Sequence, residues 1–171
     1  MNTGQTLLSL GAVALLSFLV IRINSFTIET EEDHINTRLG LVAISFASTY
    51  LDVIRSKAYD EVVLDSTKPS ISLNDLTYPL GSEPGEIFPN FDDVDDYNFN
   101  GEVRQDSSTL VNPFDNSKKT LLYFTSSVNY VSPNNPNQIL TSKEWTKRID
   151  VKVWAKEMKD TIKLSLITSY L

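Results

Sequence analysis

The stretch that decides the fold is Leu7–Ile21, LLSLGAVALLSFLVI, which only two serines and one glycine interrupt. No charged side chain precedes it, and the first one that follows is Arg22. With Ile23 beyond the arginine, the apolar run is about 17 residues long, near the lower limit for a helix that spans a bilayer core. Arg22 can extend its guanidinium to the membrane interface. The run predicts a helix that is buried in lipid or among copies of itself.

Two other interpretations of this run remain open, a cleaved secretory signal and a buried core helix. A secretory signal carries Lys or Arg before its apolar segment, and this chain has neither there. A weak A-x-A-like site, at Ala12 and Ala14, lies inside the run rather than after it. These points favour the membrane-compatible helix.

The pattern after the run predicts that the helix continues. No proline occurs before Pro69, and Gly40 is the only glycine between residues 12 and 80. Apolar side chains follow at spacings of 7, 4, 3, 4 and 7 residues, which is one helical stripe, at Ile28, Ile35, Leu39, Val42, Phe46 and Val53. The side chains that widen the stripe are Ala43, Tyr50 and Ile54, and those on the opposite face are Leu41, Ile44 and Leu51.

An acidic cluster separates the apolar run from this stripe, at Glu29, Glu31, Glu32 and Asp33. If the helix is unbroken, residues 5–58 extend for about 80 Å at a rise of 1.5 Å per residue. Alternatively, Asp33 caps the start of a second helix. In either case the first half is apolar all round and the second half is amphipathic, so a globular domain is expected to pack on the second half.

The middle of the chain differs in composition. Residues 59–119 hold five of the seven prolines, and thirteen acidic residues against four basic ones. This composition predicts an exposed, acidic loop region. It is long for a loop without structure, so short strands or turns are expected to interrupt it.

Three strand-like runs complete the chain, over residues 120–131, 147–155 and 161–171. In the second run Ile149, Val151 and Val153 alternate with polar neighbours, as in a half-buried antiparallel strand. A short turn at residues 156–160 should join the last two runs into a hairpin. We therefore expect an α+β fold, with a long N-terminal helix packed against a C-terminal antiparallel sheet. The expected division is a hydrophobic helix half at 1–24 and a globular head at 25–171, made of an amphipathic helix half at 25–58, an acidic loop region at 59–119 and a sheet at 120–171.

This order of elements resembles the type IV pilins and the pseudopilins of type II secretion. Three segments carry the resemblance. Residues 4–8, GQTLL, look like the family's processing junction, between Gly4 and Gln5. Residues 91–97, FDDVDDY, and residues 147–153, KRIDVKV, are similar to segments of minor pilins of the MSHA and PilV-like kind. The resemblance implies a structural subunit that polymerises through an N-terminal helix, with other pilin-like subunits as the alternative partners.

The chain also departs from the pilin pattern. Pilin leaders usually carry basic residues, and residues 1–3 carry none. Counting from a cleavage after Gly4 places Ser9 where most pilins have a glutamate, and counting from Met1 places Gln5 there. The helix-breaking proline that is common in pilin apolar segments is missing as well. The polymerisation helix implied by the resemblance comprises Gln5, Leu7, Leu8, Leu10, Val13, Leu15, Leu16, Phe18, Leu19, Val20 and Ile21.

One candidate metal site lies in the acidic region. Asp96-x-Asn98-x-Asn100-Gly101 matches the first half of a calcium loop, whose oxygen ligands recur at alternate positions. The glutamate expected at the twelfth position is replaced by Ser107. The carboxylates that would substitute for it are Asp92, Asp93 and Asp95. The alternative is a solvated turn whose Asp and Asn side chains bond to the local backbone.

Other functions are disfavoured by composition. The net charge is −7, so nucleic acid is not expected as a partner. Cysteine is absent and His34 is the only histidine, which leaves few groups for acid–base, nucleophilic or metal chemistry. We therefore expect no enzyme activity, and no cofactor other than the calcium ion just considered.

Two functions remain in view from the sequence. One is a subunit of an extracellular pilus-like filament, held in the cytoplasmic membrane before assembly and either a major subunit or a minor pseudopilin. The other is a single-pass, membrane-anchored domain that binds a partner outside the cell. In a filament the acidic middle of one subunit can face the basic C-terminal part of another, although pairing within one chain is equally allowed.

Overall fold

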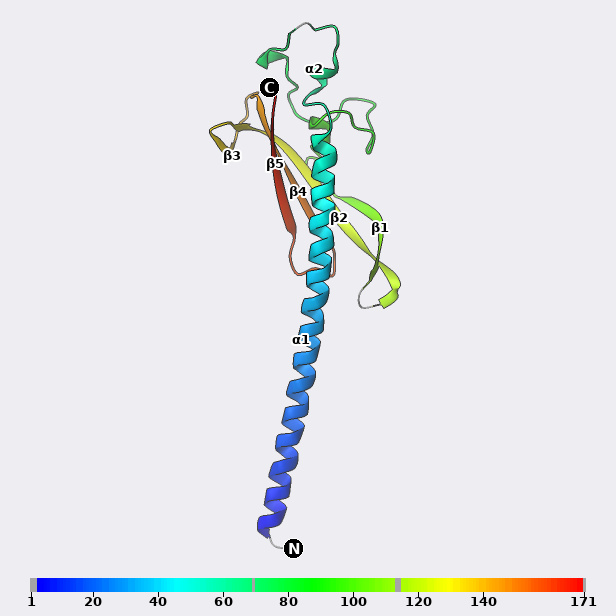
Figure 1. Ribbon diagram of the computed structural model, residues 1–171, viewed down its shortest axis with the longest axis vertical. Helices are drawn as coiled ribbons and strands as arrows, with labels where there is room; N and C mark the ends of the chain where they lie inside the picture. Colours follow the sequence, from blue (N-terminus) through cyan, green and yellow to red (C-terminus); the bar gives the residue numbers. More distant parts are fainter. Residues whose placement is uncertain (1–2, 69, 113–114, 171) are drawn as a thin grey trace. The chain divides into compact units, whose positions relative to one another are not determined.

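The computed structural model describes residues 3–68, 70–112 and 115–170 (Figure 1). Helix α1 runs without a break from Thr3 to Arg55, so the acidic cluster at residues 29–33 does not interrupt it. The chain forms two compact units, Met1–Arg38 and Leu39–Leu171, and the last part of α1 belongs to the second. The first unit is helical throughout its described residues.

The second unit contains an antiparallel sheet of five strands. The strands are β1 (Arg104–Asn112), β2 (Asp115–Ser132), β3 (Asn135–Ile139), β4 (Thr146–Trp154) and β5 (Ile162–Ser169). Their order is β1-β2-β4-β5, and β3 pairs with the end of β2. The expected hairpin is confirmed: β4 and β5 are antiparallel, with Val153 opposite Ile162. The chain is therefore α+β, as the sequence predicts.

The last turns of α1 cover one face of this sheet (Figure 1). Alternation along β2 and β4 directs Leu122, Phe124, Val128, Ile149, Val151 and Val153 toward the helix, and all six are buried. From α1 the buried side chains are Leu39, Ala43, Ala47, Tyr50, Leu51 and Ile54. Two small alanines at the contact allow the helix to approach the sheet closely, and Tyr50 packs edge-on against Phe124 with ring centroids 5.1 Å apart.

The buried face of α1 differs from the predicted stripe. Leu51 was expected on the opposite face and is buried, with 8% of its surface exposed. Val53 was expected in the stripe and is 43% exposed. The reason is that Ala43, Tyr50 and Ile54, which the prediction placed at the side of the stripe, are buried together with Ala47, which the prediction did not include. A pattern scored on large apolar residues undervalues alanine, which the close helix–sheet contact selects.

The acidic region at residues 59–119 contains short elements of secondary structure, as its length predicts. It contains the short helix α2 (Glu61–Leu64), two 3₁₀ turns, η1 (Leu73–Asp75) and η2 (Asp95–Tyr97), and strand β1. A backbone bridge joins Ala58 to the acidic segment, where Ala58 N–H donates to the Asp92 carbonyl at 3.1 Å and Val94 N–H donates to the Ala58 carbonyl at 3.0 Å. Phe99 N–H then donates to the Ser126 carbonyl on β2 at 3.2 Å. The segment from Phe91 to Phe99 thus connects the end of α1 to the sheet.

Candidate functional site

The apolar first part of α1 is a surface without cover in the described chain. Leu7, Leu8, Leu10, Val13, Leu15, Leu16, Phe18, Leu19, Val20 and Ile21 each expose more than half of their surface. Ile23, Phe26 and Ile28 continue this surface, with exposures of 58%, 71% and 51%. The segment is long and apolar enough to cross a membrane, and a signal sequence near an N-terminus would pass the same test. Its composition is thus consistent with membrane association.

The polar atoms of this segment are satisfied within the helix. The Ser9 hydroxyl donates to the Thr6 carbonyl at 2.9 Å, and the Ser17 hydroxyl donates to the Val13 carbonyl at 2.9 Å. Such bonds to the preceding turn remove the need for water around a hydroxyl. Gly4 and Gln5, the predicted processing junction, lie in the first turns of the same helix. The segment can therefore enter an apolar environment without leaving these hydroxyls unpaired.

The acidic segment folds as a turn whose carboxylates bond to nearby backbone groups. One oxygen of Asp93 accepts hydrogen bonds from Asp95 N–H at 2.9 Å and Asp96 N–H at 3.2 Å. One oxygen of Asp96 accepts in return from Asp92 N–H at 3.2 Å and Asp93 N–H at 3.3 Å. Asp93 and Asp96 thus each bond to backbone N–H groups at the other's end of the turn that contains η2. The solvated-turn alternative predicts such bonds to the local backbone, but it does not predict that both aspartates are buried.

Asp95 points away from this turn and into a buried ion triad. Lys147 Nζ lies 2.6 Å from Asp95 Oδ1 and 2.8 Å from Asp60 Oδ2, and the side chains of all three residues are fully buried. The ammonium also donates to the Tyr59 carbonyl at 2.8 Å and lies 4.4 Å from the centroid of the Tyr59 ring. From the sequence, Lys147 was considered only as part of the basic C-terminal region, for which pairing within one chain was an open alternative. The signal that it belongs inside was its position two residues before Ile149, on the inner face of β4.

Asn98 and Asn100 face a different direction from Asp95. Together with Asp96 they line an open cleft of about 440 Å³, which Leu80, Phe91 and Arg104 also border. The Asn98 amide donates to the Leu80 carbonyl at 3.0 Å, and its oxygen accepts from Val128 N–H at 3.3 Å. The structure therefore brings Asp96, Asn98 and Asn100 to one cleft, whereas Asp93 and Asp95 serve the turn and the triad.

Burial and like charge raise the pKa of these carboxyl groups. The pKa of Asp93 is raised to about 8 by burial and then by the charges of Asp95 and Asp96. The pKa of Asp95 is raised to about 6, because burial outweighs the attraction of Lys147. The pKa of Asp96 is raised to about 6 by burial and by its contact with Glu86. These carboxyl groups therefore keep their protons to a higher pH than free aspartates do.

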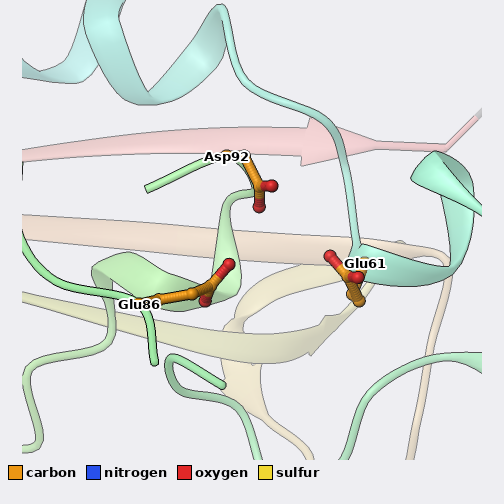
Figure 2. Close-up of side chains that lie close together, drawn as sticks. All are labelled: Glu61, Glu86 and Asp92. Carbon is orange, nitrogen blue, oxygen red and sulfur yellow. The ribbon is translucent and has the colours of Figure 1, made fainter. Parts of the chain in front are cut away.

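Two groups of carboxylates converge beside the turn. They combine Asp92 and Asp96 with three glutamates that the sequence analysis did not single out. Glu61, Glu86 and Asp92 form one group, and Glu83, Glu86 and Asp96 form the other. Within each group, one oxygen from each residue lies within 4.8 Å of the others. Figure 2 shows the first group, whose side chains point toward a common space from three separate segments. No local motif marks this set, because Glu61 and Asp92 come together only through the bridge between Ala58 and the acidic segment.

No protein-family model, no curated protein and no solved structure matches this chain. The general form, with a long apolar N-terminal helix followed by an antiparallel sheet, fits that of a pilin. A function must therefore be argued from the two features above, the uncovered apolar helix and the acidic region of the head.

Proposed function

We propose that this chain is a structural subunit of an extracellular type IV pilus-like filament, and that it polymerises through the apolar first part of α1. The observation that carries the proposal is the contrast along one helix. Leu39–Ile54 buries one face against the chain's own sheet, whereas the apolar side chains from Leu7 to Ile28 remain exposed. Burial of such surface contributes about 25 cal/mol per Å² of apolar area.

Copies of the same helix are the occupant that fits this surface best. The segment is apolar on every side, as a helix surrounded by others requires, rather than along one stripe. Its serine hydroxyls are already bonded within the helix. The partners proposed are thus other copies of this chain or related pilin-like subunits, with the membrane as the site of the segment before assembly.

The second candidate is a single-pass, membrane-anchored domain that works outside the cell. It is supported by the same length and composition of the apolar segment. The two candidates differ in where the assembled protein is found. Shearing intact cells releases surface filaments and leaves single-pass anchors in the membrane.

The test compares the wild-type chain with Leu15→Lys and a matched control, Thr30→Lys. Leu15 lies in the middle of the apolar run, and an unpaired charge there costs several kcal/mol in an apolar surrounding. Thr30 lies in the exposed acidic stretch of α1, so a lysine there should be tolerated. We expect wild-type protein and the Thr30→Lys variant in sheared filaments seen by electron microscopy, and at least a tenfold loss of sheared protein for Leu15→Lys.

Two results would refute the filament proposal. One is that wild-type protein stays entirely with the membrane after shearing, which would favour the anchored domain. The other is normal filaments from Leu15→Lys. Near-ultraviolet circular dichroism of the purified chain in detergent would show whether the head of each variant is folded, because both tryptophans, Trp145 and Trp154, lie in the head.

A further inference from the structure

The acidic region of the head contains two groups of three carboxylates, and one residue belongs to both groups. Glu86 belongs both to the group with Glu61 and Asp92 and to the group with Glu83 and Asp96. In each group the carboxylate oxygens lie within 4.8 Å of one another, a spacing that suits ligands of a single ion. All five residues belong to the unit Leu39–Leu171.

Local structure holds these side chains in place. Asp60 caps α2 by accepting from Val62 N–H at 3.4 Å, which fixes Glu61 as the first residue of that helix. In the turn from Glu83 to Glu86, Glu86 N–H donates to the Glu83 carbonyl at 3.2 Å, and Glu83 N–H donates to Glu86 Oε2 at 3.0 Å. The bridge at Ala58 brings Asp92 next to the start of α2. Hydrogen bonds to backbone groups thus hold these positions against the mutual repulsion of the carboxylates.

An unpartnered oxygen of Asp96 points to a missing ligand. Asp96 is only 1% exposed. Its Oδ2 accepts the two backbone hydrogen bonds of the turn, and its Oδ1 is buried with no hydrogen-bond partner. A buried charged oxygen without a partner is destabilising. The Oδ2 atoms of Asp93 and Asp95 are also buried without a partner among the described residues, but neither residue belongs to a group of converging carboxylates. The Asp96 carboxylate lies within 4.8 Å of those of Glu83 and Glu86, where a shared cation would complete it.

No basic side chain neutralises this set. In the described part of the chain, none of the five carboxylates forms an ion pair with a lysine or arginine. The nearby cations bond to other groups. Lys147 pairs with Asp60 and Asp95, and Arg104 pairs with Glu102 at 3.8 Å. The Lys57 ammonium, which lies beside the segment that holds Asp92, donates to the Phe91 carbonyl. Among the described residues, the charge of the set is therefore not balanced by a lysine or an arginine.

We propose that Glu83, Glu86 and Asp96 bind a divalent cation, that Glu61 and Asp92 extend this site through the shared Glu86, and that calcium is the ion that fits. All the donors are carboxylate oxygens, which are hard ligands, and neither nitrogen nor sulfur donors belong to the set. Calcium accepts six to eight oxygens in irregular geometry, whereas magnesium requires a near-octahedral arrangement. Only Asp92 and Asp96 are shared with the linear calcium motif that the sequence suggests. The site does not depend on whether the chain forms filaments.

The test uses the full chain in detergent micelles at pH 7.5. Thermal unfolding of the head is followed by near-ultraviolet circular dichroism in calcium, in magnesium and in chelator, with sodium chloride at equal ionic strength as the control for screening. At a calcium concentration ten times the dissociation constant, we expect the midpoint to rise by about 4 °C. Isothermal titration of the wild-type chain with calcium chloride measures binding directly.

Glu86→Gln removes the carboxylate that both groups share and keeps its shape, so the calcium-dependent rise should disappear. Glu31→Gln removes the same charge from the exposed part of α1 and should keep the rise. If Glu86→Gln fails to fold, Glu83→Gln takes its place, because Glu83 is a half-exposed turn residue. Absence of calcium binding to the wild type, or an equal rise in the variant that lacks the ligand, would overturn the proposal. If calcium does not change the midpoint of the wild type and Glu86→Gln raises that midpoint, the carboxylates bind protons rather than a metal ion, which also overturns the proposal.

Discussion

Replacing Lys147 with methionine is the sharpest test of how the head is held together. Methionine is unbranched and nearly as long as lysine, so it keeps the contact with the rings of Tyr59 and Tyr130 while it removes the charge. Asp60 and Asp95 would then remain buried without a cation, since Lys147 is the only side chain that forms an ion pair with either of them in the described structure.

The expected cost follows from what each carboxylate retains. Asp60 still accepts from Thr77 N–H at 3.1 Å and from the Thr77 hydroxyl at 3.0 Å. Among the described residues, Asp95 loses the side-chain hydrogen bond that its Oδ1 accepts from Lys147, and its Oδ2 already has no partner. Removing one member of a buried ion pair typically costs about 3–5 kcal/mol. A head of this size should then unfold roughly 10–20 °C lower, at about 3–4 °C per kcal/mol.

Thermal melts of the full chain in detergent, followed in the near-ultraviolet, measure this shift. The control is Lys152→Met, which removes the same charge from an exposed position on the same strand and should change stability by less than about 0.5 kcal/mol. In the double variant Lys147→Met with Asp95→Asn, one stranded charge is gone, so at least half of the loss should return. A decrease of less than 3 °C for Lys147→Met, or no recovery in the double variant, would refute the argument that the buried charges must balance.

Two further predictions concern the head. The stability of the head in chelator should fall as the pH rises from about 4 to 8. The folded state raises the pKa of Asp93 from 3.8 to about 8, so in this range the folded head binds a proton that the unfolded chain has already released. The resulting stabilisation is complete below about pH 4 and is lost as the pH passes 8. Melts across this range would show a smaller slope for Asp93→Asn, and a midpoint that climbs with pH would contradict the sign. Ile54→Ala should lower the free energy of unfolding by about 2–5 kcal/mol, because Ile54 is fully buried between α1 and the sheet, whereas Leu41→Ala, at a position 63% exposed, should change it little in urea titrations.

The helix and the sheet could be predicted because their signals are local. The absence of glycine and proline from most of the first 68 residues permits one helix. Alternation in residues 147–155 gives a strand, and its inner face is the one expected. The exact buried face of α1 could not be predicted, because Ala43 and Ala47 are selected by the close approach of the sheet. Such an approach is a property of the packed pair rather than of the helix sequence.

The acidic region could be predicted only in part, because many of its contacts join residues that are far apart in the sequence. Its turn residues are local, and the mutual capping of Asp93 and Asp96 follows a pattern typical of such residues. The partners of Asp95 and the neighbours of Asp92 come from distant positions. Lys147 is 52 residues from Asp95, and Glu61 meets Asp92 only because Ala58 pairs with the chain on either side of Asp93. Sequence patterns within a short window do not contain this information.

The three buried aspartates of the acidic segment are chemically alike, and their surroundings give them different roles. Asp93 bonds to two backbone N–H groups inside the turn, so its role is to shape the turn. Asp95 meets an ammonium, so it ties the turn to β4 and, through Asp60, to the start of α2. Asp96 bonds to the backbone with one oxygen and leaves the other without a partner beside Glu83 and Glu86. Each of the three keeps one buried oxygen without a hydrogen-bond partner among the described residues, but only Asp96 also belongs to a group of converging carboxylates, with Glu83 and Glu86. Asp93 and Asp95 thus have architectural roles, and Asp96 is the one at the proposed cation site. A bound cation at that place would connect the turn after Phe91 to the turn at Glu83 and to α2, and would therefore stabilise the part of the head that has the least secondary structure.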